Sequence, residues 1–540
     1  MAFQLSTVVL IVLQFQLSLT DHCIKRYFNQ NSFVCACDTR SCPSIPGTTR
    51  PPKGYIDQWV SSRSLHRFHL TRLNLNRLSR PLFPPSLVVT LRLNDRRQTI
   101  HGFGGAFTDA TGLNLATLPM ALRDQIMRDY FSTDGIDYSI GRVPIAGTDF
   151  SARVYSYDDN NGEEDLELKN FALQPEDINL KIPMIKRALE LKNGPFRLLC
   201  SPWSSPGWMK TNGNIIGAGF LKGVPGGPYY KAWAKYLFKF QHNYCFLFDR
   251  FLDSYSKEGI NFWAMTTQNE PNIAIEIGIF LLHNLRFTPE NMRDWVKYDL
   301  GPELEKAGYG RDKLNLLLLD DNRQLLVNYT QIVLKDETAA SFINGIAFHW
   351  YKINNQPHYN ELNVVHNNFP NHFLISTEAC EGYQSSSAIK AQLGNWTRAE
   401  TYAKDIIKDL NRYTTGWVDW NLVLDTKGGS SYENNSADAL ILVDTDRKIY
   451  YRNPMFYSLG HFSKFIPPGS VYIGHQVQGN SRGVYLAAFE DPSNQMVIVI
   501  LNTNDYPVNL IINKFAQVPV PITLDGHSIR TLLTPSRKVN

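Results

Sequence analysis

The sequence predicts an α/β protein built around a closed (β/α)8 TIM barrel, with an accessory β-sandwich beside it. From about residue 98 to 425, apolar β-branched runs alternate with amphipathic helical runs, which is the pattern of a parallel sheet wrapped by helices. The flanks, residues 51–97 and 466–540, carry short alternating runs broken by Pro, Gly and Asn, as in a β-sandwich. At 540 residues the chain is long enough for one large domain and a smaller companion.

The first segment, residues 1–20, is typical of a secretory signal peptide. Its apolar run starts at Val8 and continues to Leu19, and small polar residues at Ser18 and Thr20 permit cleavage. The run is short for a membrane span, and no later segment of the sequence is long and apolar enough to cross a bilayer. We therefore expect a soluble mature chain in an oxidising compartment.

Cysteine placement agrees with this expectation, because four of the seven cysteines fall within residues 21–50: Cys23, Cys35, Cys37 and Cys42. Clustered cysteines staple a loop-rich terminus through disulfides, although four of them could also hold a zinc ion. The signal segment just upstream favours disulfides. Sequons at Asn328, Asn395 and Asn434 predict N-glycosylation, although such triplets often occur by chance.

Eight strand candidates make up the barrel region. In chain order they are Thr99–Ala106, Asp137–Pro144, Phe196–Ser201, Asn261–Thr267, Lys313–Leu319, Gly345–His349, His372–Ser376 and Gly416–Leu422. Helical runs lie between them, among them Ala121–Tyr130, Ile178–Leu191, Pro289–Lys306 and Arg398–Asn411. The third of these follows Thr288 and opens with a proline, which is an N-cap with proline in the first turn. We assign residues 98–465 to the barrel.

The two flanks are expected to fold together, because neither offers enough strands for a two-sheet core. The formal charge of +4 is too small to indicate nucleic-acid binding. The Arg-rich stretch 63–97 is expected to be a solvated face, with an anionic lipid or glycan surface as the alternative. An aromatic content of 12% suits rings that stack on sugar faces, although β-rich cores use the same residues.

In a β/α barrel the chemistry lies at the carboxyl ends of the strands, so the polar and aromatic residues there are the candidates. They are Asp109, Arg142, Asp149, Trp203, Asn269, Glu270, His349, Tyr351, Glu378 and Trp420.

Two of these candidates, Glu270 and Glu378, follow the fourth and seventh strands and would face each other across one mouth. A retaining glycoside hydrolase needs such a pair, with carboxyl groups about 5–5.5 Å apart. Two like charges so close raise one pKa, and the protonated group can donate to the leaving oxygen. We assign Glu270 as this acid, and Glu378 as the nucleophile, held ionised and aimed by Arg142 and Tyr351.

Several of the candidate residues also have a purely structural interpretation. Asp149 follows a Gly-Thr pair and could be a turn former or cap, and Trp203 could be a core residue. His349 could be a buried histidine with satisfied hydrogen bonds, and Cys380 a small packing residue. The HExxH pattern is absent from the sequence, and we expect neither a metal nor a cofactor.

Several segments together resemble the lysosomal acid β-glucosidase (glucosylceramidase) group of glycoside hydrolase family 30. They are "TQNEP", "STEAC", "HGFGGAFTDA", "GRVPIAGTDF", "SPWSSPGWMKTNG", "AFHWY", "GWVDWNL" and "PMFYSLGHFSKFIPPGS". The resemblance runs from Cys23 nearly to the C-terminus and keeps the order and approximate spacing of these segments. It implies a (β/α)8 barrel, a β-sandwich from both flanks, and a small N-terminal sheet formed by residues 21–50 with part of 422–453.

The resemblance also implies residue roles. Glu270 matches the acid/base and Glu378 the nucleophile, and disulfides are implied for Cys23–Cys35 and Cys37–Cys42. The residues that match the family's glucose-binding positions are Asp149, Trp203, Asn269, Trp420 and Asn435. Those that match the shell around the nucleophile are Arg142, His349 and Tyr351.

The implied activity is hydrolysis of glucosylceramide to glucose and ceramide, in the lysosome at the luminal membrane surface or after secretion. The implied partners are an anionic lipid surface and a saposin-type activator protein, with no nucleic acid. The alternatives are another retaining β-glycosidase, such as a β-xylosidase or a steryl glucosidase, and a non-catalytic lectin-like protein.

The chain departs from the family pattern in three places. About eleven extra residues lie around 241–251 and are either a real extension of the helix before the fourth strand or a misread gene model. The segment 272–287 after Glu270 is unusually apolar and could touch lipid or pack inward. Tyr432 stands where the family has its aromatic residue before Asn435.

Overall fold

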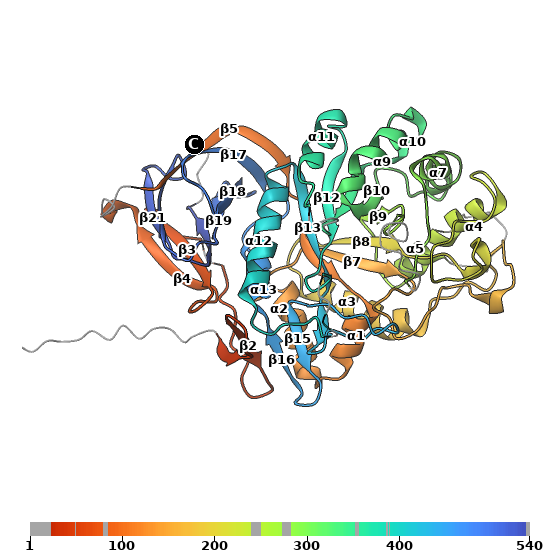
Figure 1. Cartoon of the computed structure of the whole chain (residues 1–540), viewed down its shortest axis with the longest axis horizontal. Coiled ribbons are helices and arrows are strands. Elements are labelled where there is room, and N and C mark those ends of the chain that lie inside the picture. The colour runs from red at the N-terminus through yellow and green to blue at the C-terminus, as the bar shows by residue number, and fades with distance from the viewer. Residues whose placement is uncertain are drawn as a thin grey trace, which may run out of the picture.

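The computed structural model describes residues 23–48, 50–78, 85–238, 250–272, 282–351, 356–384, 387 and 389–535. The expected signal segment 1–20, residues 241–249 of the expected insertion and residues 273–281 of the apolar segment lie outside the described residues. The described strands form three sheets: a closed eight-stranded barrel, a nine-stranded sheet and a five-stranded sheet. Figure 1 shows the nine-stranded sheet at the left and the barrel at the right, with the five-stranded sheet below.

The barrel confirms the predicted fold class. Its parallel strands are β6 (Gly102–Ala106), β7 (Ile140–Ile145), β8 (Arg197–Pro202), β9 (Ala264–Thr266), β10 (Asn315–Asn322), β11 (Gly345–His349), β12 (Phe373–Glu378) and β13 (Thr414–Asn421). Strand β13 pairs with β6 and so closes the barrel. Each predicted strand overlaps the observed one, because runs of β-branched and apolar residues suit strands that are buried on both faces.

The barrel interior is filled rather than hollow. One apolar cluster takes a residue from each of seven successive strands: Ile140, Leu199, Ala264, Leu317, Ala347, Ile375 and Val418. Such a layer of side chains makes the inside of the barrel a packed core and not a pore.

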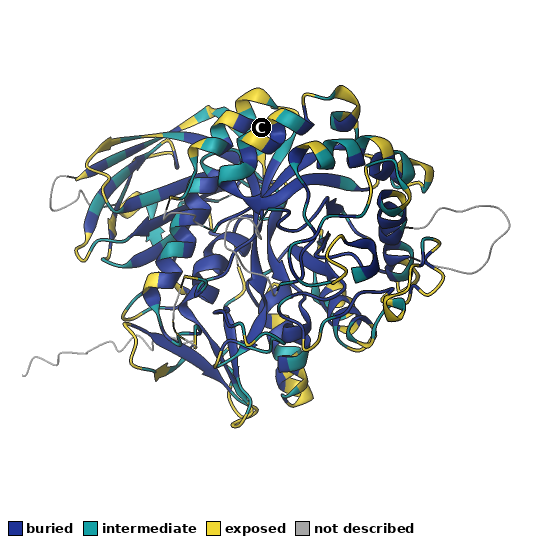
Figure 2. Ribbon diagram, turned by 45° about the vertical axis from the view of Figure 1, so that its right-hand side comes forward, coloured by how far each residue is buried: buried dark blue, intermediate teal, exposed yellow. Residues whose placement is uncertain are grey.

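Helices cover the outside of the barrel, and Figure 2 shows exposed residues on the outer faces of several of them. They are α1 (Asp109–Ala116), α2 (Met120–Phe131), α3 (Ile182–Leu191), α4 (Pro228–Leu237), α5 (Phe251–Lys257), α7 (Pro289–Trp295), α8 (Gly301–Lys306), α9 (Leu326–Val333), α10 (Glu337–Phe342), α11 (Asn360–Asn368), α12 (Trp396–Leu410) and α13 (Pro454–Ser463). The Thr288 side chain accepts a hydrogen bond from the Asn291 amide at the start of α7, which confirms the predicted N-cap. No helix within the described ranges is long and apolar enough to cross a membrane.

The nine-stranded sheet combines both flanks, as predicted. The N-terminal flank gives β3 (Tyr55–Ser62), β4 (His69–Asn74) and β5 (Leu87–Thr99); the C-terminal flank gives β17 (Val471–Gly479), β18 (Val484–Glu490), β19 (Met496–Asn502), β20 (Val508–Asn513), β21 (Val520–Leu524) and β22 (Ser528–Leu533). Strand β5 lies between β20 and β17, and β3 pairs with β22. Successive residues alternate between two cores: Leu486 packs inside the curled sheet, while Ala487 packs toward the barrel through α12 and α13.

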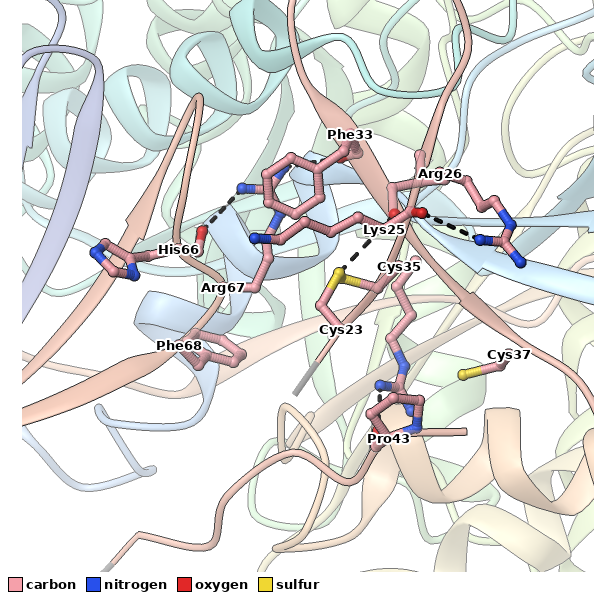
Figure 3. Close-up of a disulfide and its surroundings, with 12 residues drawn as sticks. Cys23, Lys25, Arg26, Phe33, Cys35, Cys37, Pro43, His66, Arg67 and Phe68 are labelled. Atoms are coloured by element: carbon pink, nitrogen blue, oxygen red, sulfur yellow. Dashed lines mark hydrogen bonds between the residues drawn. A yellow bond between two sulfur atoms is a disulfide. The ribbon is translucent and has the colours of Figure 1, made fainter. Parts of the chain in front are cut away.

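The five-stranded sheet contains the disulfide-bonded N-terminal segment. It joins β1 (Ile24–Tyr27) and β2 (Phe33–Cys37) to β16 (Ile449–Arg452), β15 (Ile441–Asp444) and β14 (Val423–Asp425). The structure contains the disulfides Cys23–Cys35 and Cys37–Cys42. In Figure 3, Arg67 stacks on the Phe33 ring at 3.9 Å and also donates to the Phe33 carbonyl at 2.8 Å, so the N-terminal segment is tied to the chain just beyond β3.

Candidate active site

Glu270 and Glu378 lie at the same end of the barrel. Glu270 follows β9, and Glu378 is the last residue of β12. One carboxylate oxygen of each residue lies within 4.8 Å of the other. This separation agrees with the retaining geometry of about 5–5.5 Å and is shorter than the roughly 6.5–9.5 Å of inverting enzymes.

Hydrogen bonds fix both carboxylate oxygens of Glu378. Arg142, from β7, donates through Nη1 to Oε2, and the Tyr351 hydroxyl donates to Oε1 at 2.8 Å. Arg142 is fully buried, and its Nη2 also donates to the Asn269 side-chain oxygen at 2.7 Å. The Glu378 carboxylate is therefore held in one orientation from two sides.

Glu270 lies in an unusual backbone conformation that is held by hydrogen bonds. Its φ of 43° falls in the left-handed region, which non-glycine residues rarely occupy. Its amide donates to the Asp320 carbonyl at 2.9 Å, and its carbonyl accepts from the Asn284 side chain at 2.9 Å. Burial raises the pKa of the Glu270 carboxyl; the hydrogen bond from His349 opposes this rise, and the nearby Glu378 charge adds to it. The net direction suits a carboxyl group that must keep its proton.

Asp320 is not among the candidates predicted from the sequence. It lies at the centre of the hydrogen-bond network that supports the two glutamates. It accepts from Arg142 Nη2 at 2.8 Å, from His349 Nε2 at 2.9 Å, and from the hydroxyls of Thr266 at 2.7 Å and Thr377 at 2.5 Å. Burial by itself raises the pKa of Asp320, but the charges of Arg142 and His349 outweigh it and lower that pKa well below its usual value. A fully buried carboxylate is thus paired with two cations, one of which, Arg142, also pairs with Glu378.

His349 links the two acids. Its Nδ1 lies 3.2 Å from Glu270 Oε1, and its Nε2 lies 2.9 Å from Asp320 Oδ1. Burial by itself lowers the pKa of His349, but the Glu378 charge and the two carboxylate contacts raise it to about 10. His349 is both a buried, satisfied histidine and a direct neighbour of the candidate acid.

Within the described ranges, Glu270, His349 and Glu378 are the group whose ligand atoms come close enough to be considered for a metal ion. The raised pKa of His349 favours protons on both of its ring nitrogens, and these protons compete with a metal for the same lone pairs.

The candidate sugar-binding residues lie around this pair. Asp149, after β7, accepts from the Asn435 side chain at 3.0 Å, and burial together with the charges of Glu378 and Glu270 raises the pKa of Asp149 to about 8. The rings of Trp203 and Trp420 are stacked, with centroids 5.2 Å apart. Arg142 lies over the Trp203 ring at 4.7 Å, so these tryptophans adjoin the Glu378 side of the mouth.

Other candidates lie elsewhere. Asp109 accepts from Ser151 and Tyr155 and lies 3.6 Å from the buried Lys181, so it belongs to a network behind the mouth. The Cys380 thiol is buried and lies 3.4 Å from the Tyr351 hydroxyl, which agrees with a packing residue. The sequon residues Asn328 and Asn434 are exposed, whereas Asn395 is partly buried.

One signal in the sequence could have identified Asp320. The apolar run of the fifth predicted strand is followed directly by two acids, Asp320 and Asp321, and both are fully buried in the structure. The prediction ended that strand at Leu319 and considered no polar residue at its end. Strand β10 in fact continues to Asn322 through a bulge between Leu319 and Asp321.

Comparison with known proteins gives matches over nearly the whole chain. Residues 100–466 match the family described as "Glycosyl hydrolase family 30 TIM-barrel domain", and residues 469–532 match "Glycosyl hydrolase family 30 beta sandwich domain". The chain is 40% identical over 513 residues to lysosomal acid glucosylceramidase of Mus musculus, covering 95% of each chain. It is 37% identical over 503 residues to putative glucosylceramidase 4 of Caenorhabditis elegans, covering 93% of each. The crystal structure of SrfJ from Salmonella typhimurium superposes with a TM-score of 0.75 at 25% identity, covering 89% of this chain and 100% of that one.

Proposed function

Because this chain belongs to glycoside hydrolase family 30, we propose that it is a retaining β-glucosidase that hydrolyses glucosylceramide to glucose and ceramide. The observation that carries the proposal is the pair of buried glutamates whose carboxylate oxygens approach within 4.8 Å at the mouth of the barrel. The 40% identity to a glucosylceramidase over 95% of the chain supports the choice of substrate.

In the first step Glu378 attacks the anomeric carbon of the glucose unit, and Glu270 gives its proton to the oxygen of the leaving ceramide. This step forms a covalent glycosyl-enzyme intermediate. Arg142 and Tyr351 aim the attacking carboxylate through their two hydrogen bonds. Burial of Glu270 and the charge of Glu378 favour the protonated form that the leaving group needs.

In the second step a water molecule attacks the same carbon, Glu270, now ionised, accepts a proton of that water, and the bond to Glu378 breaks to release its carboxylate and glucose. The configuration at the anomeric carbon is retained because it is inverted twice. Asn269, Asp149 and Asn435 are the proposed partners of the glucose hydroxyls, and Trp203 and Trp420, which are buried and stacked on each other, are the proposed aromatic residues beside them. Arg142 fixes the Asn269 oxygen, so the Asn269 amide nitrogen can donate to the sugar.

The proposed substrate also bears on the cellular location of the protein. A relative named as lysosomal supports a lysosomal location, and the expected signal segment supports entry into the secretory pathway. We further propose that the protein acts peripherally at the luminal membrane, on an anionic lipid surface and with a saposin-type activator, because ceramide must be reached at a bilayer. Of the apolar segment 272–287, the described residues His283, Asn284, Leu285 and Phe287 are buried and pack inward, so they do not form a lipid contact.

Incubation of the purified protein with a panel of lipid and soluble β-glycosides at acidic pH tests the activity. We expect release of glucose from glucosylceramide, slower release from a steryl glucoside, and little xylose from a β-xyloside. Glu378→Gln should abolish turnover, by about 10³-fold or more. Glu270→Gln should lower kcat/KM far more for poor leaving groups than for activated ones, because only poor leaving groups need a proton donor.

Two outcomes would contradict the proposal. Sugar binding without hydrolysis at any pH would favour the lectin-like alternative. A product of inverted configuration, followed by NMR of the released sugar, would exclude the retaining mechanism even if the protein is a glucosidase.

A further inference from the structure

Lys210 is a fully buried lysine in the segment that follows β8. Its Nζ donates to the carbonyls of Asn284 at 2.6 Å, Ile215 at 2.7 Å and Gly217 at 3.1 Å, and it lies 3.3 Å from the Ser204 hydroxyl. Within the described ranges no carboxylate forms an ion pair with it, and burial alone acts on its pKa, lowering it to about 7. A buried ammonium with only neutral acceptors is costly, so its position needs a reason.

Lys210 joins two loops of the mouth. Ile215 and Gly217 belong to the segment after β8, whereas Asn284 belongs to the segment that follows Glu270. The two segments also pair directly, through an antiparallel bridge between Ile216 and His283 and a hydrogen bond from the Gly217 amide to the Leu282 carbonyl at 2.9 Å. The Lys210 ammonium lies at the centre of this junction.

Asn284 continues the connection to the candidate acid. Its carbonyl accepts from Lys210, and its side-chain amide donates to the Glu270 carbonyl at 2.9 Å. Glu270 adopts a φ of 43°, which a glutamate does not hold without support. The support on its amide side is the Asp320 carbonyl, and the support on its carbonyl side is Asn284.

We propose that Lys210 is a positioning residue for Glu270, acting through Asn284 to hold the backbone from which the acid projects. The inference rests on the proposed function, because it concerns the proton donor of that reaction. Without the ammonium, three carbonyls lose their common donor, the junction of the two loops loosens, and the Glu270 carboxyl departs from its place beside the leaving oxygen.

The test is Lys210→Met, which keeps the length of the side chain and removes its donors. We expect kcat/KM for an alkyl β-glucoside, a poor leaving group, to fall by about 10–100-fold. We expect kcat/KM for 2,4-dinitrophenyl β-glucoside to fall by less than about threefold, because this leaving group departs without a proton. Lys210→Arg keeps a donor and should recover part of the loss.

A matched control is Lys464→Met. Lys464 is also a buried lysine that donates to two carbonyls, those of Thr133 and Gly135, each at 2.8 Å, but these precede β7 and so lie at the opposite end of the barrel. Lys464→Met should lower the melting temperature and leave the ratio of the two kcat/KM values unchanged. If Lys210→Met does not yield folded protein, Asn284→Ala carries the test, since it removes the amide donor to Glu270 and should produce the same selective loss.

The two proposals fail in different ways. If wild-type protein hydrolyses neither substrate, the proposed function fails. If wild-type and Glu270→Gln behave as a retaining glucosidase requires, but Lys210→Met and Asn284→Ala slow both substrates equally or neither, the positioning inference is overturned alone.

Discussion

At the scale of single residues, the site depends on a buried carboxylate that does not touch the substrate in the proposed mechanism. Asp320 receives hydrogen bonds from Arg142 and His349, and these two residues contact Glu378 and Glu270 respectively. Asp320 therefore fixes the orientation of the donors that orient both glutamates. A pair of buried cations without this anion would be strongly disfavoured, so the network is expected to be sensitive to loss of any member.

Substitution of Asp320 by Asn keeps the shape of the side chain but replaces one acceptor by a donor. Because all four hydrogen-bond partners of Asp320 donate, one of them must face the new amide group. We expect kcat/KM to fall by about 10²-fold or more, and the free energy of unfolding to fall by about 3 kcal/mol. Steady-state kinetics and urea denaturation at pH 5 measure the two effects.

Asp57→Asn is the matched control for this prediction. Asp57 is a fully buried acid of β3 that accepts from Arg72 at 2.7 Å, in the nine-stranded sheet. We expect Asp57→Asn to lose stability and to keep kcat/KM. Unchanged activity in Asp320→Asn would refute the position given to Asp320 in the network.

At the scale of elements, helix α12 connects the parts of the fold. It packs against barrel strand β13 and helix α13 on one side and against β18 and β19 of the nine-stranded sheet on the other. In Figure 1 it stands between the two sheets. Its N-cap is Asn395, whose side-chain oxygen accepts from the Arg398 amide at 3.2 Å and whose amide group donates to Gln392 at 2.6 Å. The side chain of Asn395, a predicted glycosylation site, therefore caps the N-terminus of α12.

Replacement of Asn395 by Ala removes this cap, and we expect the free energy of unfolding to fall by about 1 kcal/mol. Asn395→Asp keeps an acceptor for the Arg398 amide and should retain most of the stability. The exposed sequon residue of α9 provides the control: Asn328→Ala should change stability by less than about 0.5 kcal/mol. Equal losses at Asn328 and Asn395 in protein without glycans would contradict the capping argument.

Glycan occupancy is a separate question that the same residues raise. We expect Asn328 and Asn434, which are exposed, to carry glycans more completely than Asn395, whose side chain has two hydrogen bonds within the fold. Mass spectrometry of glycopeptides from protein expressed in a glycosylating host measures this occupancy.

At the scale of the whole molecule, hydrophobic periodicity along the sequence predicted the barrel and the nine-stranded sheet. It did not predict buried polar residues whose partners are distant in the sequence. The eight strands and the chemistry at two of their ends follow from periodicity and from residue type. Asp320 was missed because the change from leucines to acids looked like the end of a strand, while the backbone continues through positive φ values of 81° at Leu319 and 66° at Asp320.

Lys210 was missed for a related reason. In the sequence a lysine among Trp, Met, Thr and Asn suggests a solvated loop, and only the fold brings the Asn284 carbonyl to its ammonium. The domain boundaries at 97/98 and 465/466 stay predictions, and strand β5 runs past the first of them to Thr99. Burial of a charge depends on partners distant in the sequence, which periodicity does not report.

Protonation in the mouth should make the folded protein more stable in acid than at slightly alkaline pH. The pKa of Asp149 is raised from 3.8 to about 8 by burial and by the charges of Glu378 and Glu270, so the folded state binds this proton more tightly than the unfolded chain does. The stability that this group contributes is therefore complete below pH 3.8 and is lost as the pH rises to about 8. The raised pKa of Glu270 acts in the same direction.

We accordingly expect the melting temperature to fall by a few degrees between pH 5 and pH 8. Asn cannot titrate, so Asp149→Asn should reduce this fall, even if it lowers stability at pH 5 through its contact with Asn435. Differential scanning fluorimetry of both proteins between pH 5 and pH 8 separates the lost Asn435 contact from the lost titration of Asp149. Only the change of melting temperature with pH depends on that titration. If wild-type and Asp149→Asn lose stability in parallel, then Asp149 titrates alike in the folded and unfolded states, and the mouth does not hold its proton as the geometry requires.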